Sequence, residues 1–129
     1  MKRNYTYEDY NKFFEDIGFP DAIAMRTTVP PVFSEIPPNV PILCLHGSGI
    51  NTPVTYTYAN GTFPNGPPVR IFGDGDGTVT NVSLQGCTRW QDKQKQPIII
   101  KEFNNSEHNG ILQNKHLINL VKDFLYNAD

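Results

Sequence analysis

The second half of the chain alternates between short apolar strands and helical segments, and this order constrains the fold more than any other feature. Strands are predicted at Val69–Phe72 and Pro97–Phe103, with a helix between them at Ser83–Gln91 and another over residues 111–125. Two strands joined through a helix are typical of a parallel sheet. We therefore expect an α/β fold with a few-stranded, mostly parallel sheet in which these two strands pair.

The first half adds helices, one further strand and a hairpin. Thr6 is a candidate N-cap, and aromatic residues at helical spacing follow it until Gly18 ends the run. The apolar segment Val40–His46 reads as a buried strand, which we expect to join the same sheet. Val54–Tyr58 alternates between apolar and polar residues and is followed closely by an Asn-Gly pair, a hairpin signal.

Composition excludes several classes of function. With 38% hydrophobic residues the chain is ordinary for a globular protein, and its 129 residues fit a single domain or part of one. Charged residues are 19% of the chain and the net charge is −2, so we expect no nucleic-acid partner. No apolar run is long enough for a transmembrane segment, and the residues after Met1 do not resemble a signal peptide.

Candidate catalytic residues follow the two predicted parallel strands. The segment Gly73–Val79 (GDGDGTV) comes directly after the first strand, and His108 lies a few residues after the second. Functional groups gather at the carboxyl ends of strands in open α/β sheets. Asp76 and His108 are 32 residues apart and stand in the order of the last two members of an α/β-hydrolase Ser-Asp-His triad.

Other interpretations of these residues stay open at this point. A calcium loop of the EF-hand type starting at Asp74 would need Gly and Glu where the chain has Val79 and Gln85. The aspartates could instead cap the next helix, and His108 could be an ordinary loop residue. We expect His46 to be structural and His116 to be solvated. No spacing matches a zinc site, so we expect no metal and no cofactor.

The chain offers no recognisable nucleophile for such a triad. An α/β-hydrolase serine sits on a G-x-S-x-G elbow between a strand and a helix, upstream of the Asp and His. No such elbow occurs in the sequence, and Gly47–Ser48–Gly49 lacks the spacing. We interpret the chain as lacking its nucleophile.

The cysteines and the glycosylation sequons bear on the compartment. Cys44 and Cys87 are 43 residues apart and permit one disulfide, although composition alone favours two buried, reduced cysteines of a cytosolic protein. Four N-x-S/T sequons indicate a secretory origin only weakly. These candidate glycosylation sites are Asn4, Asn60, Asn81 and Asn104.

Several segments together resemble one family. The match covers about residues 4–126, and its most specific part is the GDGDGTV segment followed by C-x-x-W-Q. The matching segments are Tyr5–Asp16, Cys44–Gly49, Thr52–Pro53, Tyr56, Tyr58, Gly73–Val79, Cys87, Trp90–Gln91, Glu107–His108 and Ile111–Leu112. They are similar to the C-terminal part of the lecithin:cholesterol acyltransferase family, which includes lysosomal phospholipase A and plant phospholipid:diacylglycerol acyltransferases.

The resemblance implies a fold, a reaction and site residues. Residues 1–129 would be one partial domain, the C-terminal segment of an incomplete α/β-hydrolase. Family members move an acyl group from a phospholipid to a sterol, another lipid alcohol or water through an acyl-serine. By the resemblance, the catalytic acid falls on Asp76 rather than Asp74, the catalytic base on His108, and a disulfide on Cys44 and Cys87. Members often have Tyr where this chain has His46.

Three functions compete at this stage. The first is the C-terminal portion of a lipid O-acyltransferase or phospholipase, which we expect to be inactive alone. Phospholipid and acyl acceptor would then bind through a missing N-terminal part or a complementing N-terminal chain. The second is a non-catalytic remnant with a lipid- or partner-binding role. The third is an unrelated intracellular α/β domain. The resemblance implies a secreted, lysosomal or endomembrane location, whereas the chain itself leaves both the compartment and the acyl acceptor open.

Overall fold

The structure is a computed structural model and describes residues 3–30 and 35–126. The chain divides into two compact units. The first unit comprises Met1–Ser34 and Tyr56–Val69, and the second comprises Glu35–Thr55 and Arg70–Asp129. The expectation of one partial domain over residues 1–129 stays a prediction.

The first unit contains a short helical hairpin. A 3-10 helix, η1 (Tyr7–Asp9), leads into α1 (Tyr10–Asp16), and α2 (Asp21–Thr28) follows. The hydroxyl of Thr6 accepts a hydrogen bond from the Glu8 amide, and the Asp9 carboxylate accepts one from the Thr6 amide at 2.8 Å. The predicted N-cap is therefore confirmed. Ring contacts link this hairpin to residues 58–63 within the unit, through Tyr5, Phe13, Tyr58 and Phe63.

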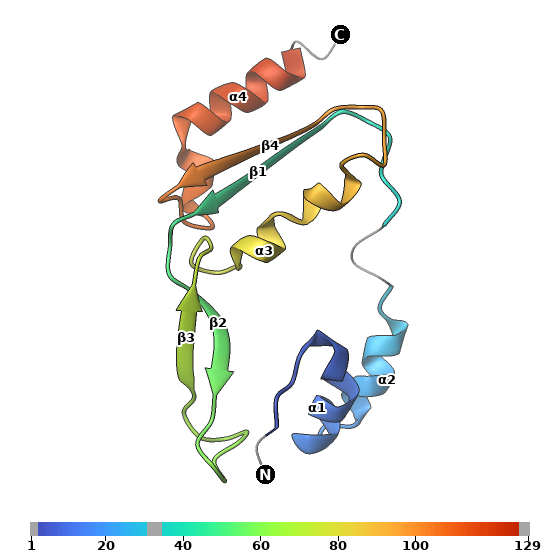
Figure 1. Ribbon diagram of the computed structural model, residues 1–129, viewed down its shortest axis with the longest axis vertical. Helices are drawn as coiled ribbons and strands as arrows, with labels where there is room; N and C mark the ends of the chain where they lie inside the picture. The colour runs from blue at the N-terminus through green and yellow to red at the C-terminus, as the bar shows by residue number, and fades with distance from the viewer. Residues whose placement is uncertain (1–2, 31–34, 127–129) are drawn as a thin grey trace. The chain divides into compact units, whose positions relative to one another are not determined.

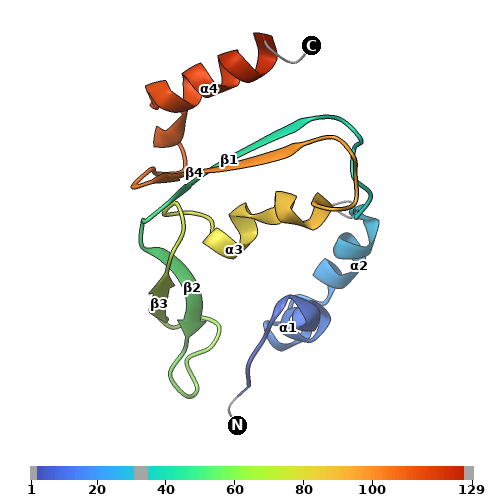
Figure 2. The ribbon, with the colours of Figure 1, turned by 45° about the horizontal axis from the view of Figure 1, so that its top comes forward.

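The second unit is built on two parallel strands. β1 (Ile42–Ser48) pairs with β4 (Ile98–Asn104) along its whole length. Figures 1 and 2 show α4 (Lys115–Tyr126) on one side of this pair and α3 (Asn81–Leu84) on the other. The amphipathic α4 buries Leu117, as the apolar pattern at its start predicts. The expected α/β class, with a small parallel sheet and helices, is confirmed.

One predicted strand pairing is wrong. The strand predicted at Val69–Phe72 is present as β3 (Val69–Gly73), but it pairs with β2 (Thr52–Thr57) and not with β4. In Figure 1 β2 and β3 run in opposite directions. The partner of β4 is β1, more than 50 residues away. The apolar pattern of a strand identifies its buried face but not its neighbour. The segment that joins β2 to β3 is also shorter than the one that joins β3 to β4, so closing it costs less chain entropy.

Other boundaries shift by a few residues for local reasons. β1 begins after Pro41, which has no amide hydrogen for the ladder. The helix predicted at Ser83–Gln91 is divided, because Gly86 opens a separate 3-10 helix, η2 (Gly86–Trp90). A third 3-10 helix, η3 (Gly110–Gln113), precedes α4. Among the helices of residues 3–30 and 35–126, none combines the length and apolarity needed to cross a bilayer.

Candidate active site

The most buried side chains of the second unit are polar and lie near the carboxyl end of β1. His46, Ser48, Thr52 and Asp76 are each at most 4% exposed. The Ile50 amide donates a hydrogen bond to the Gly75 carbonyl at 3.0 Å, and Ile50 and Asp76 form a parallel bridge. The acidic loop at residues 73–79 is thereby placed beside the segment that leaves β1, although it follows β3 in sequence.

Asp76 and His108 meet at this end of the sheet. The Asp76 Oδ2 atom lies 2.8 Å from the His108 Nδ1 atom, as predicted. The backbone amide of His108 also donates to the Asp76 carbonyl at 2.9 Å. Two contacts therefore hold the loop after β4 to the acidic loop, one through the backbone and one through the side chains.

The second carboxylate oxygen of Asp76 is held by its own loop. Its Oδ1 atom accepts hydrogen bonds from the amides of Thr78 at 3.0 Å and Val79 at 2.8 Å. Burial raises the pKa of Asp76, but the hydrogen bonds from Val79, His108 and Thr78 together outweigh it, so its pKa lies below the ordinary value. An ionised carboxylate has no proton to donate, so the His108 Nδ1 atom must be the donor.

The lowered pKa of Asp76 predicts how the stability of the fold depends on pH. The ionised Asp76 stabilises the fold above its unfolded pKa of about 4, and the contribution is lost as the pH falls through the lower folded value. We expect the free energy of unfolding, measured by urea titration from pH 7 to pH 2.5, to fall less steeply below pH 4 in Asp76→Asn than in the unmodified chain. Parallel curves for the two proteins would contradict the assignment.

His108 is placed as a base, with Nδ1 held by Asp76 and the rest of its side chain partly exposed to solvent. Its side chain is 45% exposed, whereas that of Asp76 is 4% exposed. The buried carboxylate orients the imidazole through Nδ1, which leaves Nε2 as the atom that can take a proton from an approaching hydroxyl. A base that is oriented by a third group in this way can activate a hydroxyl or thiol nucleophile.

Asp74 does not take part in this pair. Its Oδ1 atom accepts a hydrogen bond from the Gly49 amide at 2.8 Å, and its Oδ2 atom accepts one from the Asn81 side-chain amide at 2.8 Å. The carboxylate thus ties the start of α3 to the segment after β1. Asp74 therefore lies away from His108, and it bonds a backbone amide of a different segment rather than one of its own turn.

Ser48 and His46 are buried beside the site and do not reach it. Ser48 is 1% exposed, and its hydroxyl donates to the Glu102 Oε1 atom at 2.5 Å, so it is not available to attack a substrate. Neither ring nitrogen of His46 has a hydrogen-bond partner among the described residues, and its Nε2 atom lies 3.8 Å from Glu102 Oε2. His116 is exposed at the start of α4, as expected.

The predicted disulfide is present. Cys44 on β1 is bonded to Cys87 in η2, with a Cα–Cα distance of 6.5 Å. The bond joins the sheet to the segment that follows the acidic loop and α3. It therefore ties the segment on the C-terminal side of the loop that carries Asp76 to β1.

The four sequons differ in what their side chains do. Asn4 and Asn60 are exposed outside helices and strands. Asn104 is exposed at the last position of β4, and the side-chain nitrogen of Asn81 is used by Asp74. Glycosylation at each of them stays a prediction.

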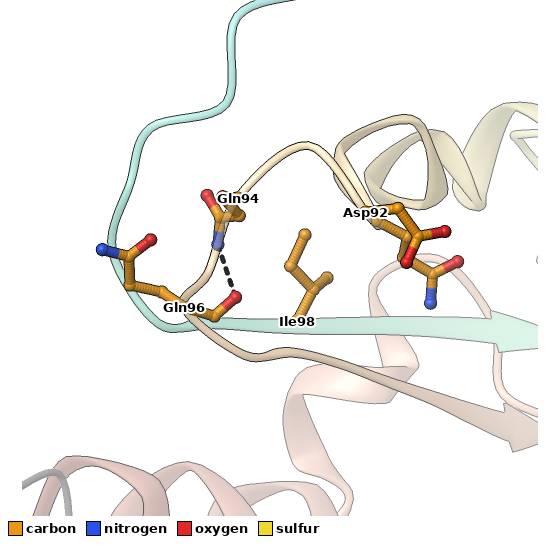
Figure 3. A pocket seen from close by; sticks show the side chains of 5 residues that line it. Asp92, Gln94, Gln96 and Ile98 are labelled. Carbon is orange, nitrogen blue, oxygen red and sulfur yellow. Dashed lines mark hydrogen bonds between the residues drawn. The ribbon is translucent and has the colours of Figure 1, made fainter.

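A polar pocket lies at the opposite end of the sheet from Asp76 and His108. It has a volume of about 360 Å³ and is lined by Gln91, Asp92, Gln94, Gln96 and Ile98 (Figure 3). Ile98 is the first residue of β4, whereas His108 follows its last. The Gln94 side-chain amide donates to the carbonyls of Gln96 and Val40, so it secures the loop before β4. The pocket is therefore separate from the candidate active site.

Comparisons with known proteins show which family the chain is similar to. The family model described as lecithin:cholesterol acyltransferase matches residues 25–123. The chain is 42% identical to the human lysosomal phospholipase A and acyltransferase over 123 residues, 95% of this chain. It is 39% identical to phosphatidylcholine-sterol acyltransferase of Eliomys quercinus over 115 residues, or 87% of this chain. The chain spans 29% of the length of the human relative and 38% of that of the other.

Proposed function

Because the chain belongs to the lecithin:cholesterol acyltransferase family, we propose that it carries the acid and the base of a Ser-Asp-His triad in a lipid O-acyltransferase or phospholipase. Asp76 is the acid and His108 is the base. The reaction transfers an acyl group from a phospholipid to a lipid alcohol or to water. The chain is the C-terminal part of an α/β-hydrolase fold, and the nucleophilic serine comes from sequence outside these 129 residues.

The 2.8 Å contact between His108 Nδ1 and Asp76 Oδ2 carries this proposal. In the first half-reaction, His108 Nε2 takes the proton of the serine hydroxyl as its oxygen bonds to the acyl carbonyl carbon. His108 then delivers that proton to the leaving lysophospholipid oxygen as the ester bond breaks. The second half-reaction repeats these steps with the acceptor hydroxyl or water attacking the acyl-serine. The ionised Asp76 stabilises the imidazolium that forms each time and remains ionised.

Two further observations support a nucleophile from outside this sequence. Ser48 is buried and bonded to Glu102, and no G-x-S-x-G elbow occurs among the 129 residues. Several large apolar side chains are also exposed. Val82 is 89% exposed, Leu112 is 70% exposed and Leu125 is 69% exposed, which fits packing against additional sequence, either continuous with this chain or on a complementing chain.

The disulfide and the relatives also favour a location in the secretory pathway. Disulfides persist in oxidising compartments, and the human relative is named as lysosomal. Phospholipid and a lipid acyl acceptor would be the partners of the complete enzyme. We assign neither a metal nor a cofactor, because the proposed steps move only protons and an acyl group.

A chimera tests this function. The chain alone, and the chain joined behind the region that precedes the matched segment in the human relative, are incubated with phosphatidylcholine vesicles with and without cholesterol. We expect fatty acid or cholesteryl ester from the chimera and only background from the chain alone. The control is a chimera whose elbow serine is replaced by alanine, which should be inactive. Hydrolysis by the chain alone that depends on Ser48 would overturn the proposal, and an inactive but folded chimera would favour a non-catalytic remnant.

A further inference from the structure

Thr52 is the most buried side chain of the second unit and touches the acidic loop directly. It is 0% exposed. Its hydroxyl donates a hydrogen bond to the Ile50 carbonyl and accepts one from the Gly77 amide, both at 2.9 Å. A hydroxyl can donate once and accept at the same time, so one buried group satisfies two backbone groups. Gly77 is the residue directly after Asp76.

The acidic loop is thereby tied to the same short segment on both sides of Asp76. On one side the Ile50 amide donates to the Gly75 carbonyl at 3.0 Å, and on the other the Gly77 amide donates to Thr52. Thr52 also bonds back to Ile50, which joins the two anchors to each other. Asp76 lies between them, and a shift of either anchor would move its carboxylate.

The loop also packs against Thr52 without spare room. A Cβ atom at Gly75 would lie 2.5 Å from the Thr52 Oγ1 atom and 2.2 Å from the Val79 carbonyl oxygen, so only glycine fits there. Gly77 has a φ of +89°, a conformation that favours glycine. The glycines of the GDGDGTV segment therefore let the loop close down on the threonine hydroxyl.

We propose that Thr52 is a positioning residue that holds Asp76 in line with His108. The inference concerns the geometry of the pair, and its meaning for catalysis rests on the proposed function. Serine at position 52 keeps the hydroxyl, whereas valine keeps the shape but leaves the Gly77 amide without its hydrogen-bond acceptor. Without that anchor the loop is free to shift, and the carboxylate no longer faces the His108 Nδ1 atom in one orientation.

The test uses nitrogen-15 NMR of the 129-residue chain near pH 7. In the unmodified chain and in Thr52→Ser we expect His108 to show one tautomer, protonated at Nδ1, with a hydrogen-bonded Nδ1 proton. In Thr52→Val we expect the signal of the Nδ1 proton to disappear through exchange with water, and His108 to populate both neutral tautomers. Leu117→Ala, which removes a buried apolar side chain from α4, is the control for a general loss of stability and should keep the signal.

Each outcome of this test decides the proposal. An unchanged Nδ1 signal in Thr52→Val, or an equal loss in a folded Leu117→Ala, would overturn it. If Thr52→Val does not fold, hydrogen exchange of the Gly77 amide in the unmodified chain replaces it. We expect that amide to exchange at least about 100-fold more slowly than in the unfolded chain, and protection below about tenfold would refute the anchor. Because these measurements need no activity, an inactive chimera would count against the proposed function and not against this positioning role.

Discussion

His108→Ala is expected to lower kcat/KM for phospholipid cleavage by 10³-fold or more in the complete enzyme, represented by the chimera. The His108 imidazole is the one base that the structure places against the buried Asp76 carboxylate among residues 3–30 and 35–126, at 2.8 Å. Without it the serine keeps its proton, and the leaving oxygen receives none. The residual rate then reflects binding and oxyanion stabilisation alone.

The measurement is initial-rate release of fatty acid from phosphatidylcholine vesicles by purified chimera. His116→Ala is the matched control, because His116 is an exposed histidine at the start of α4 and makes no contact with Asp76 in the structure. This control should keep the parental rate, and its circular dichroism spectrum should match that of His108→Ala. A loss of less than about tenfold in a folded His108→Ala chimera would remove His108 from the role of base.

Removing the disulfide is expected to lower the free energy of unfolding of the chain by roughly 3–4 kcal/mol. Cys44 and Cys87 close a loop of 43 residues, and in the chain-entropy model the bond lowers the conformational entropy of the unfolded chain, which regains that entropy when the bond is removed. A domain of this size is stabilised by only about 5–15 kcal/mol in total, so the change is a large share. The loop contains Asp76, so loss of the bond also frees the segment after the acidic loop from β1.

The experiment is urea unfolding of the double variant Cys44→Ala/Cys87→Ala against the oxidised chain at pH 7. The m-value is compared between the two, because a more expanded unfolded state exposes more surface. The reduced unmodified chain is the control for the substitutions themselves and should be destabilised by a similar amount. A difference in unfolding free energy below about 1 kcal/mol, with equal m-values, would show that the bond restricts the unfolded chain very little.

The sequence by itself determined the local elements and the order of the chemistry. Apolar runs that end at glycines or prolines locate β1, β3 and β4. The Thr6 hydroxyl, followed three residues later by the Asp9 carboxylate, locates the start of η1. These signals depend only on neighbours along the chain, and so sequence spacing was enough to find them. The same holds for the acid that follows one strand and the histidine that follows another.

Choosing between the two acids needed more than spacing. Asp74 and Asp76 are chemically equivalent in GDGDGTV, and only the family resemblance points to Asp76. In the structure the two differ because of what surrounds each: Asp74 turns to Gly49 and Asn81, whereas Asp76 is buried against His108. Burial and hydrogen-bond donors from distant segments produce that difference, and no local pattern records them.

Only the tertiary structure decided which strands pair and how the acidic loop is held. The sequence pattern suggested that Val69–Phe72 pairs with Pro97–Phe103, but β4 pairs with β1 and β3 with β2. Period-two patterning specifies the faces of a strand and leaves its partner to long-range packing. Thr52 illustrates the same limit: a threonine at a strand start looks ordinary in sequence. Its role in positioning Asp76 emerges only when β1, its continuation at Ile50 and the loop after β3 are folded together.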